Sequence, residues 1–281
     1  MKKMCSLLLL LFVLLFTSCV ETQTVAQECP ATHTPQCPFG QPVYSPTPPH
    51  APAVGVVTRD QYSLGYSYWY DSALWACETI TRTELHGTAK RKSSFSLDPA
   101  LSKYMQTKSS QYTNSGYDRA HIVAATNQLW SQPHMDQTFY MTNVTPMRPS
   151  FNRGIWRQFE QWVRDWVTAH GDAYTITGAV FLSSPLYELG FEHLHNDSDN
   201  AFVPSHFYKI LVSKRGTTSW HAIAFLFDHK FEHKAPYDWK DYVISIRKLE
   251  VMTQLDFMPS LSTTNWKRME ADEANFDLWR D

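Results

Sequence analysis

The sequence predicts an α+β fold in which a mixed, mainly antiparallel sheet carries flanking helices. Two observations support this: several apolar, β-branched runs typical of strands, and one long amphipathic helix that does not alternate with them regularly. A regular alternation would instead indicate a doubly wound parallel sheet. Hydrophobic residues make up 43% and charged residues 19% of the 281 residues, which excludes wholesale disorder and collagen-like or coiled-coil fibres.

The strand signals are clearest in the second half of the chain. Residues 174–181 form a β-branched, apolar run typical of a buried strand. Residues 206–212 and 220–227 indicate a strand pair that turns at residues 215–217. A further strand candidate covers residues 241–246.

The clearest helix is expected over residues 151–169, before the helix-stopping Gly171. At about 100° per residue, Asn152 falls near the middle of its apolar face. A buried amide is costly unless it is bonded, and a helix cap or a loop contact is the simplest explanation of this one. Glu160 and Arg164 lie at the edge of the same face, so the three polar residues can line one side of a cleft.

The N-terminus indicates export. Two lysines precede an apolar run over residues 7–16, which is shorter than the roughly 20 residues that span a bilayer. Residues 1–18 are therefore interpreted as a secretory signal peptide. Cys19 ends a stretch similar to a bacterial lipobox, so lipidation at Cys19 and plain signal cleavage both stay open. We expect a periplasmic, lipid-tethered or secreted protein without a transmembrane segment after signal removal.

The remaining chain divides by composition. Residues 19–53 are expected to form an exposed proline-rich tether, because eight of the 16 prolines lie between Pro30 and Pro52. Residues 54–281 then form one catalytic domain. Export favours disulfides, and Cys37 can pair with either Cys29 or Cys77. The absence of a CxxC pair argues against a structural zinc site.

Polar and charged residues that can act in catalysis gather near the middle of the chain. The run 118–121 reads Asp-Arg-Ala-His, residues 143–146 read Asn-Val-Thr-Pro, and Asn152 is followed by Trp156 and Glu160. A neutral imidazole is a natural general base, and amide and carboxylate oxygens suit Mg²⁺. The net charge of −2 provides no overall attraction to nucleic acid, so phosphate has to be bound by local basic residues.

In these motifs the chain resembles the DNA/RNA non-specific endonucleases, the ββα-metal or His-Me finger group. The family signature is Asp-Arg-Gly-His, then Asn-x-x-Pro-Gln, then Asn-x-x-x-Trp with a Glu eight residues after that Asn. The resemblance implies the ββα-metal fold and an Mg²⁺-dependent endonuclease, with Mn²⁺ as a substitute ion. It also implies cleavage of DNA and RNA with little sequence preference, leaving 5′-phosphate ends.

The same resemblance assigns a role to each matching residue. His121 is the expected general base, Asn152 the direct metal ligand, and Glu160 a carboxylate that holds the metal through water. The expected phosphate ligands are Arg91, Arg119 and Arg164. Asn143 is expected to orient the active-site loop. The catalytic residues are thus expected to be His121, Arg119, Glu160 and Asn143.

Two residues depart from the family signature. Ala120 stands where the family has Gly, and Met147 where it has Gln. If the position needs a positive φ, the alanine would be strained. If it needs only a small side chain, the alanine would have little effect on the site, and we favour this second explanation. The alternative is a catalytically impaired nucleic-acid-binding protein of the same fold. A third reading is a secreted zinc hydrolase that uses later histidines, and the oligomeric state stays open.

Overall fold

A computed structural model describes residues 34–45, 51–182, 192–196, 201–215, 219–261, 263–271 and 275–280. The expected signal peptide, Cys19 and Cys29 lie outside these residues. In the part of the chain that is described, no helix is long and apolar enough to cross a membrane.

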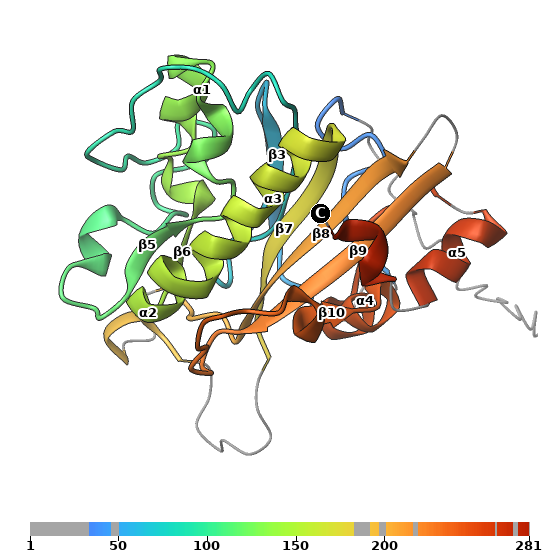
Figure 1. Ribbon diagram of the computed structural model, residues 1–281. Coiled ribbons are helices and arrows are strands. Elements are labelled where there is room, and N and C mark those ends of the chain that lie inside the picture. The colour runs from blue at the N-terminus through green and yellow to red at the C-terminus, as the bar shows by residue number, and fades with distance from the viewer. Residues whose placement is uncertain are drawn as a thin grey trace, which may run out of the picture. The chain divides into compact units, whose positions relative to one another are not determined.

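A seven-stranded sheet organises the described residues, with the strand order β10-β9-β8-β7-β4-β3-β2 (Figure 1). Every neighbouring pair in it is antiparallel, which confirms the α+β prediction with a mainly antiparallel sheet. The strands are β2 (Val54–Thr58), β3 (Tyr62–Ser67), β4 (Ser72–Ile80), β7 (Ala173–Val180), β8 (His206–Arg215), β9 (Ser219–Asp228) and β10 (Val243–Ile244).

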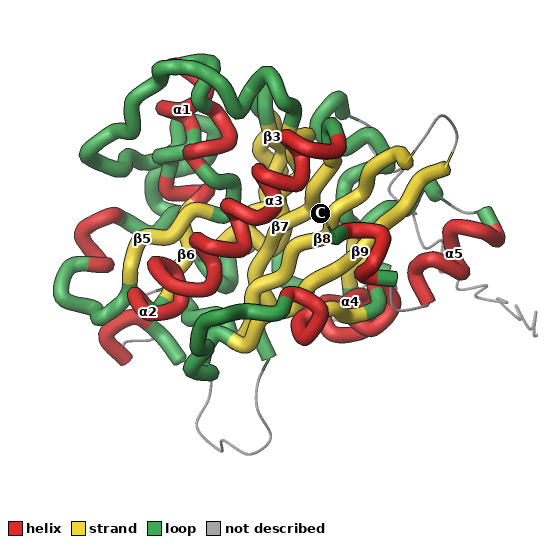
Figure 2. Tube along the Cα trace, in the orientation of Figure 1, coloured by secondary structure: helices red, strands yellow, loops and turns green. Residues whose placement is uncertain are grey.

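Two short ribbons and several helices surround this sheet (Figure 2). The ribbons pair β5 (Asp118–His121) with β6 (Val144–Met147), and β1 (Val43–Tyr44) with β11 (Leu255–Asp256). The α-helices are α1 (Gln132–Gln137), α2 (Pro149–Phe151), α3 (Arg157–His170), α4 (Ile246–Thr253) and α5 (Thr264–Ala271). The 3-10 helices are η1 (Ser109–Tyr112), η2 (Ala125–Gln128), η3 (Met141–Asn143), η5 (Leu194–Asn196), η6 (Trp239–Tyr242) and η7 (Phe276–Trp279).

The sheet buries both of its faces, and α3 crosses one of them (Figure 1). Side chains alternate along each strand, as the period of two in a strand requires. In β8, Phe207 and Leu211 pack with the residues of α3, whereas Tyr208 and Ile210 pack on the opposite face with residues of α4 and α5. We call these the α3 face and the opposite face.

The structure confirms most of the strand predictions and corrects one. The expected strand over 174–181 is β7, and the expected pair is β8 with β9. The expected strand over 241–246 is wrong: a 3-10 turn leads into the two-residue β10, and α4 begins at Ile246. The Ser245 hydroxyl accepts a hydrogen bond from the Lys248 N–H, which caps α4 and ends the extended segment.

The expected exposed tether does not include residues 34–45. Cys37 is fully buried, Phe39 is 8% exposed, and β1 adds a strand pairing to this segment. Both described cysteines, Cys37 and Cys77, are free and fully buried in the same cluster on the opposite face. Burial raises the pKa of the Cys77 thiol well above its ordinary value, and a hydrogen bond with the Cys37 thiol adds to the rise.

Candidate active site

The predicted helix over 151–169 is interrupted where Asn152 lies. A π-helical turn, η4 (Asn152–Trp156), separates α2 from α3, and Gly154 has non-helical angles of φ −96° and ψ −111°. The π-helical turn interrupts the regular period at Asn152, while Phe159, Val163 and Trp166 of the apolar face are buried as expected. Such turns occur frequently at functional sites because they re-aim side chains.

The Asn152 amide is held by a carboxylate of strand β5. Its Nδ2 donates to Asp118 Oδ2 at 2.9 Å, and Arg153 Nε donates to the same oxygen at 2.8 Å. A carboxylate only accepts hydrogen bonds, so it fixes the amide with Nδ2 inward and Oδ1 outward. Among the described residues no donor binds Oδ1. The amide thus neither caps a helix nor binds a loop, and the role of Asp118 was missed although it opens the motif.

His121 lies three residues further along the same strand. Its ring lies between Phe95 and Phe139, with centroids 5.2 and 4.8 Å away. Nε2 is buried and has no hydrogen-bond partner in the described part of the chain. Burial, followed by the positive charge of Arg91, lowers the pKa of His121 from 6.5 to about 3, so its imidazole is neutral near pH 7.

Asn143 has the contacts expected of a loop-orienting residue. Its side chain is fully buried, and Nδ2 donates to the carbonyls of Val123 at 3.0 Å and Thr138 at 2.9 Å. Its Oδ1 accepts the Val123 N–H at 2.8 Å. These bonds fix the backbone just after His121. Because its side chain is fully buried, Asn143 is suited to positioning this loop and not to direct contact with a ligand.

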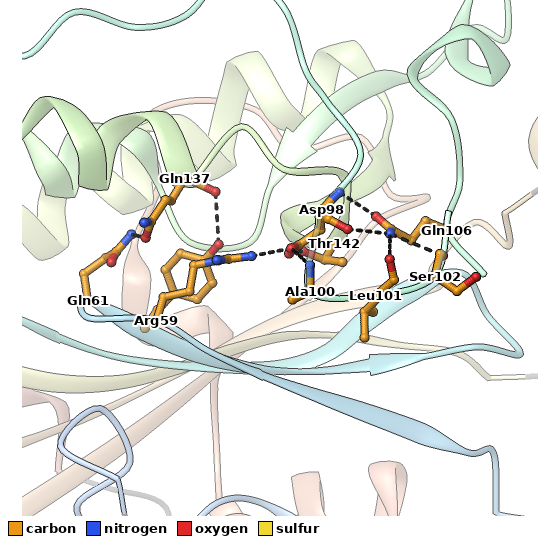
Figure 3. A network of polar contacts seen from close by, with 10 residues as sticks. Arg59, Gln61, Asp98, Ala100, Leu101, Ser102, Gln106, Gln137 and Thr142 are labelled. Atoms are coloured by element: carbon orange, nitrogen blue, oxygen red, sulfur yellow. Dashed lines mark hydrogen bonds and ion pairs between the residues drawn. The ribbon is translucent and has the colours of Figure 1, made fainter. Parts of the chain in front are cut away.

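A second buried network supports this loop from below (Figure 3). Asp98 is 1% exposed and accepts hydrogen bonds from Thr142 Oγ1 at 2.5 Å and from the side chain of Arg59. The Gln106 side chain binds both the N–H and the carbonyl of Asp98, at 2.7 and 2.8 Å. The Asp98 carboxylate thus accepts from several donors, and its bond to Thr142 anchors the residue that precedes Asn143.

Glu160 and Arg164 project from α3 and are half-buried. Burial raises the pKa of Glu160, while the charges of Lys209, Arg164 and Arg91 oppose that rise. Arg164 donates to Asn127 Oδ1 at 3.4 Å and to Gln161 Oε1 at 3.0 Å. Among the described residues no ion pair within 4.0 Å joins Arg164 to Glu160, so the guanidinium is held mainly by amides.

The other two predicted arginines are placed differently from each other. Arg91 is exposed, lies 5.5 Å from the Phe139 ring centroid, and acts electrostatically on both His121 and Glu160. These two groups therefore share one neighbourhood with Arg91. Arg119 Nε instead donates to the Ser109 carbonyl at 3.1 Å, which holds the guanidinium against η1.

Neither departure from the family signature introduces strain. Ala120 is an ordinary β5 residue paired with Thr145, 1% exposed and without a positive φ. The backbone at position 120 is therefore compatible with alanine, and the requirement for a small side chain stays a prediction. Met147 is fully buried in the core of the α3 face and contributes packing where the family has a polar side chain.

The described donor atoms fit a hard, oxygen-liganded cation better than zinc. No group of three or more His, Cys, Asp or Glu residues that could hold a metal occurs among the described residues. His195 Nε2 is hydrogen-bonded to the Gln111 carbonyl at 2.9 Å, and Glu192 pairs with Lys230 at 3.0 Å. The outward Oδ1 of Asn152 and the carboxylate of Glu160 are the oxygen donors of the kind that Mg²⁺ prefers.

Comparisons with known proteins identify the family of the chain. The sequence model of the DNA/RNA non-specific endonucleases matches residues 40–264. Mitochondrial endonuclease G of Homo sapiens is 32% identical over 159 residues, which cover 55% of this chain and 53% of that protein. Nuclease C1 of Cunninghamella echinulata is 28% identical over 215 residues, covering 73% and 83% of the two chains.

The fold also has a solved counterpart. A crystal structure of EndoG in complex with EndoGI superposes with a TM-score of 0.69 at 23% identity, over 82% of this chain and 95% of that chain. This likeness shows the ββα-metal fold. The chain matches about half the length of the endonuclease G relatives.

Proposed function

Because the chain belongs to the DNA/RNA non-specific endonuclease family, we propose that it is a metal-dependent endonuclease that hydrolyses phosphodiester bonds of DNA and RNA. One observation carries the proposal. Asp118 fixes the Asn152 amide with Oδ1 outward, and Asp118 lies on the same strand, β5, as the neutral His121. The charge of Arg91 acts on both His121 and Glu160, the carboxylate eight residues after Asn152, which supports a shared site.

His121 is the general base in this proposal. Its Nε2 is buried, so Nδ1 is the nitrogen left to take a proton from the attacking water. A bound phosphate would neutralise the Arg91 charge that disfavours protonation, which raises the basicity of the imidazole when substrate is present. General base catalysis of this kind contributes about 10²–10⁴ in rate.

Asn152 would hold Mg²⁺ directly, and Glu160 would hold it through water. When bound, the ion supplies positive charge that stabilises the phosphoryl oxygens and the leaving 3′ oxygen. Because Asn152 is neutral, it leaves that charge uncompensated. Mn²⁺, which also takes oxygen ligands, is expected to substitute. Departure of the 3′ oxygen leaves the phosphate on the 5′ end of the other fragment.

Arg91 and Arg164 are the proposed phosphate ligands, since both lie near the proposed catalytic groups. Arg119 can join them only by giving up its bond to the Ser109 carbonyl. Phosphate contacts carry no sequence information by themselves. A site built from such contacts supports cleavage of DNA and RNA with little sequence preference.

A plasmid-nicking assay with and without chelator tests this function. His121→Ala should lose at least a hundredfold in rate while keeping the wild-type melting temperature, because only the base is removed. Undiminished cutting would refute the base assignment. If the wild-type chain retards nucleic acid on a gel but cuts neither DNA nor RNA in Mg²⁺ or Mn²⁺, the alternative of an impaired binding protein holds.

We also propose that the protein is exported, through a signal peptide over residues 1–18 with cleavage or lipidation at Cys19. Several relatives are named as mitochondrial nucleases, and the support for export is this chain's own N-terminal sequence.

In an oxidising compartment the adjacent Cys37 and Cys77 would form a disulfide. The two thiols would give up two protons and two electrons to a disulfide-bearing oxidant. Since both are fully buried, this would happen while the chain folds.

A further inference from the structure

Four polar side chains interrupt the apolar α3 face directly beneath the proposed site. Glu78, Thr175, Thr177 and Lys209 are each at most 1% exposed, and they belong to the adjacent strands β4, β7 and β8. Glu78 lies opposite Thr175, and Thr177 lies opposite Lys209. Well-packed apolar side chains would often stabilise such a core as well or better. Stability alone therefore gives no reason for a buried glutamate and lysine at this place.

The polar cluster continues to Arg164 through one amide. Asn127 in η2 is 3% exposed, and its Nδ2 donates to Glu78 Oε1 at 3.0 Å. Its Oδ1 accepts from Arg164 Nη1 at 3.4 Å. Lys209 donates to Thr177 Oγ1 and provides the positive charge near Glu78. The carboxylate, the amide and the guanidinium thus form a continuous chain from the sheet to α3.

The order of donors and acceptors explains why a carboxylate lies at the buried end. Burial raises the pKa of Glu78 to about 7, while the charge of Lys209 and the hydrogen bond from Asn127 favour its ionised form. As a carboxylate, Glu78 only accepts, so it keeps the Asn127 NH₂ group inward and the carbonyl oxygen toward Arg164. A flipped amide would place its donors against the donors of the guanidinium. Asp118 fixes Asn152 in the same way, with Oδ1 facing the proposed metal position instead of an arginine.

We propose that Glu78 and Asn127 are positioning residues that hold the Arg164 guanidinium at the phosphate-binding side of the active site. This inference rests on the proposed function, because it takes Arg164 to be a phosphate ligand. Neither residue touches substrate. Their effect is to reduce the number of conformations of a long side chain before substrate binds, which lowers the cost of binding.

A double-mutant cycle on nucleic-acid binding tests the inference. The Kd for a short duplex is measured in chelator, where no cleavage occurs, for wild type, Asn127→Leu, Arg164→Ala and the double variant. Each single substitution should weaken binding roughly tenfold or more, since a hydrogen bond to a charged group is lost. The double variant should be no weaker than Arg164→Ala, because Asn127 acts only through Arg164. Additive losses would overturn the inference.

An exchange of the two side-chain types provides a control against a general packing defect. Asn127→Asp alone places two carboxylates against each other and should weaken binding. Adding Glu78→Gln restores one amide and one carboxylate with the original net charge, so the introduced aspartate accepts from Arg164 and binding should recover. Failure of this rescue in a folded variant contradicts the proposed order of donors and acceptors.

The experiment separates this inference from the function itself. If wild type cuts DNA but the cycle is additive, only the positioning role is wrong. If wild type neither binds nor cuts nucleic acid, the proposed function is wrong and the inference is wrong with it. The melting temperature of each variant is measured alongside, so that Kd values are compared only between folded proteins.

Discussion

The two faces of the central sheet differ in what they bury. The opposite face holds an aromatic and aliphatic cluster that includes the neighbouring Cys37 and Cys77 thiols. The α3 face holds a similar apolar cluster, but Glu78 and Lys209 are embedded in it, and the proposed catalytic groups lie at its border. The same strands supply both faces, so the difference comes from alternate residues of the same segments.

This difference separates residues kept for stability from residues kept for chemistry. An apolar face stabilises the fold by removing surface from water, at about 25 cal/mol per Å². A buried charge weakens that contribution unless it is paired and hydrogen-bonded. Substitutions of the polar groups at the border of the α3 face should therefore change activity more than stability, and substitutions on the opposite face should do the reverse.

The largest expected effect is at the border of the α3 face. Asn152→Ala should lower the rate of plasmid cleavage by about 10²–10³, because the direct oxygen ligand for the metal is removed. Asp118→Asn should cost about tenfold to a hundredfold, since it only orients that ligand. Both should melt close to wild type. An Asn152→Ala variant that cleaves at the wild-type rate and stays sensitive to chelator would end the assignment of this ligand.

The sequence predicts candidate site residues but not their arrangement. The buried strands follow from β-branched runs, and His121, Asn152 and Glu160 follow from motif spacing. The π-helical turn at Asn152 could not be predicted, because a regular 100° period assumes regular hydrogen bonding. Glu78 and Asn127 were missed for a related reason: each is a single polar residue in an apolar segment, and their partnership joins strand, turn and helix only after folding.

The next largest effect concerns the opposite face. If Cys37 and Cys77 are joined in the exported protein, the bond closes a loop of roughly 40 residues and stabilises the fold by about 4 kcal/mol in the chain-entropy account. Reductant should then lower the melting temperature of the protein purified from the exported fraction, while the cleavage rate per folded molecule stays constant. Cys37→Ala is the control, and reductant should not shift its melting temperature. Two free thiols in denatured, exported protein would contradict the pairing.

The smallest predicted effect is a pH dependence of the free energy of unfolding. It comes from His229, which links the end of β9 to the end of β6. His229 is fully buried; its Nε2 accepts the Arg148 N–H at 2.7 Å, and Nδ1 is hydrogen-bonded to the Pro204 carbonyl at 2.9 Å. Nε2 must therefore be unprotonated. Burial is the largest of the causes that lower the pKa of His229 from 6.5 to about 4, although the Pro204 bond opposes it.

The sign of the effect follows from proton uptake on unfolding. Below pH 6.5 the unfolded chain binds a proton at this imidazole that the folded chain does not, so stability is lost as the pH falls from about 6.5 to about 4. Over that window the loss reaches about 3 kcal/mol. His229→Gln keeps one acceptor and one donor but does not titrate, so its urea-unfolding free energy should fall less over the same pH range. Equal slopes for wild type and variant would show that His229 does not contribute to the loss of stability in acid.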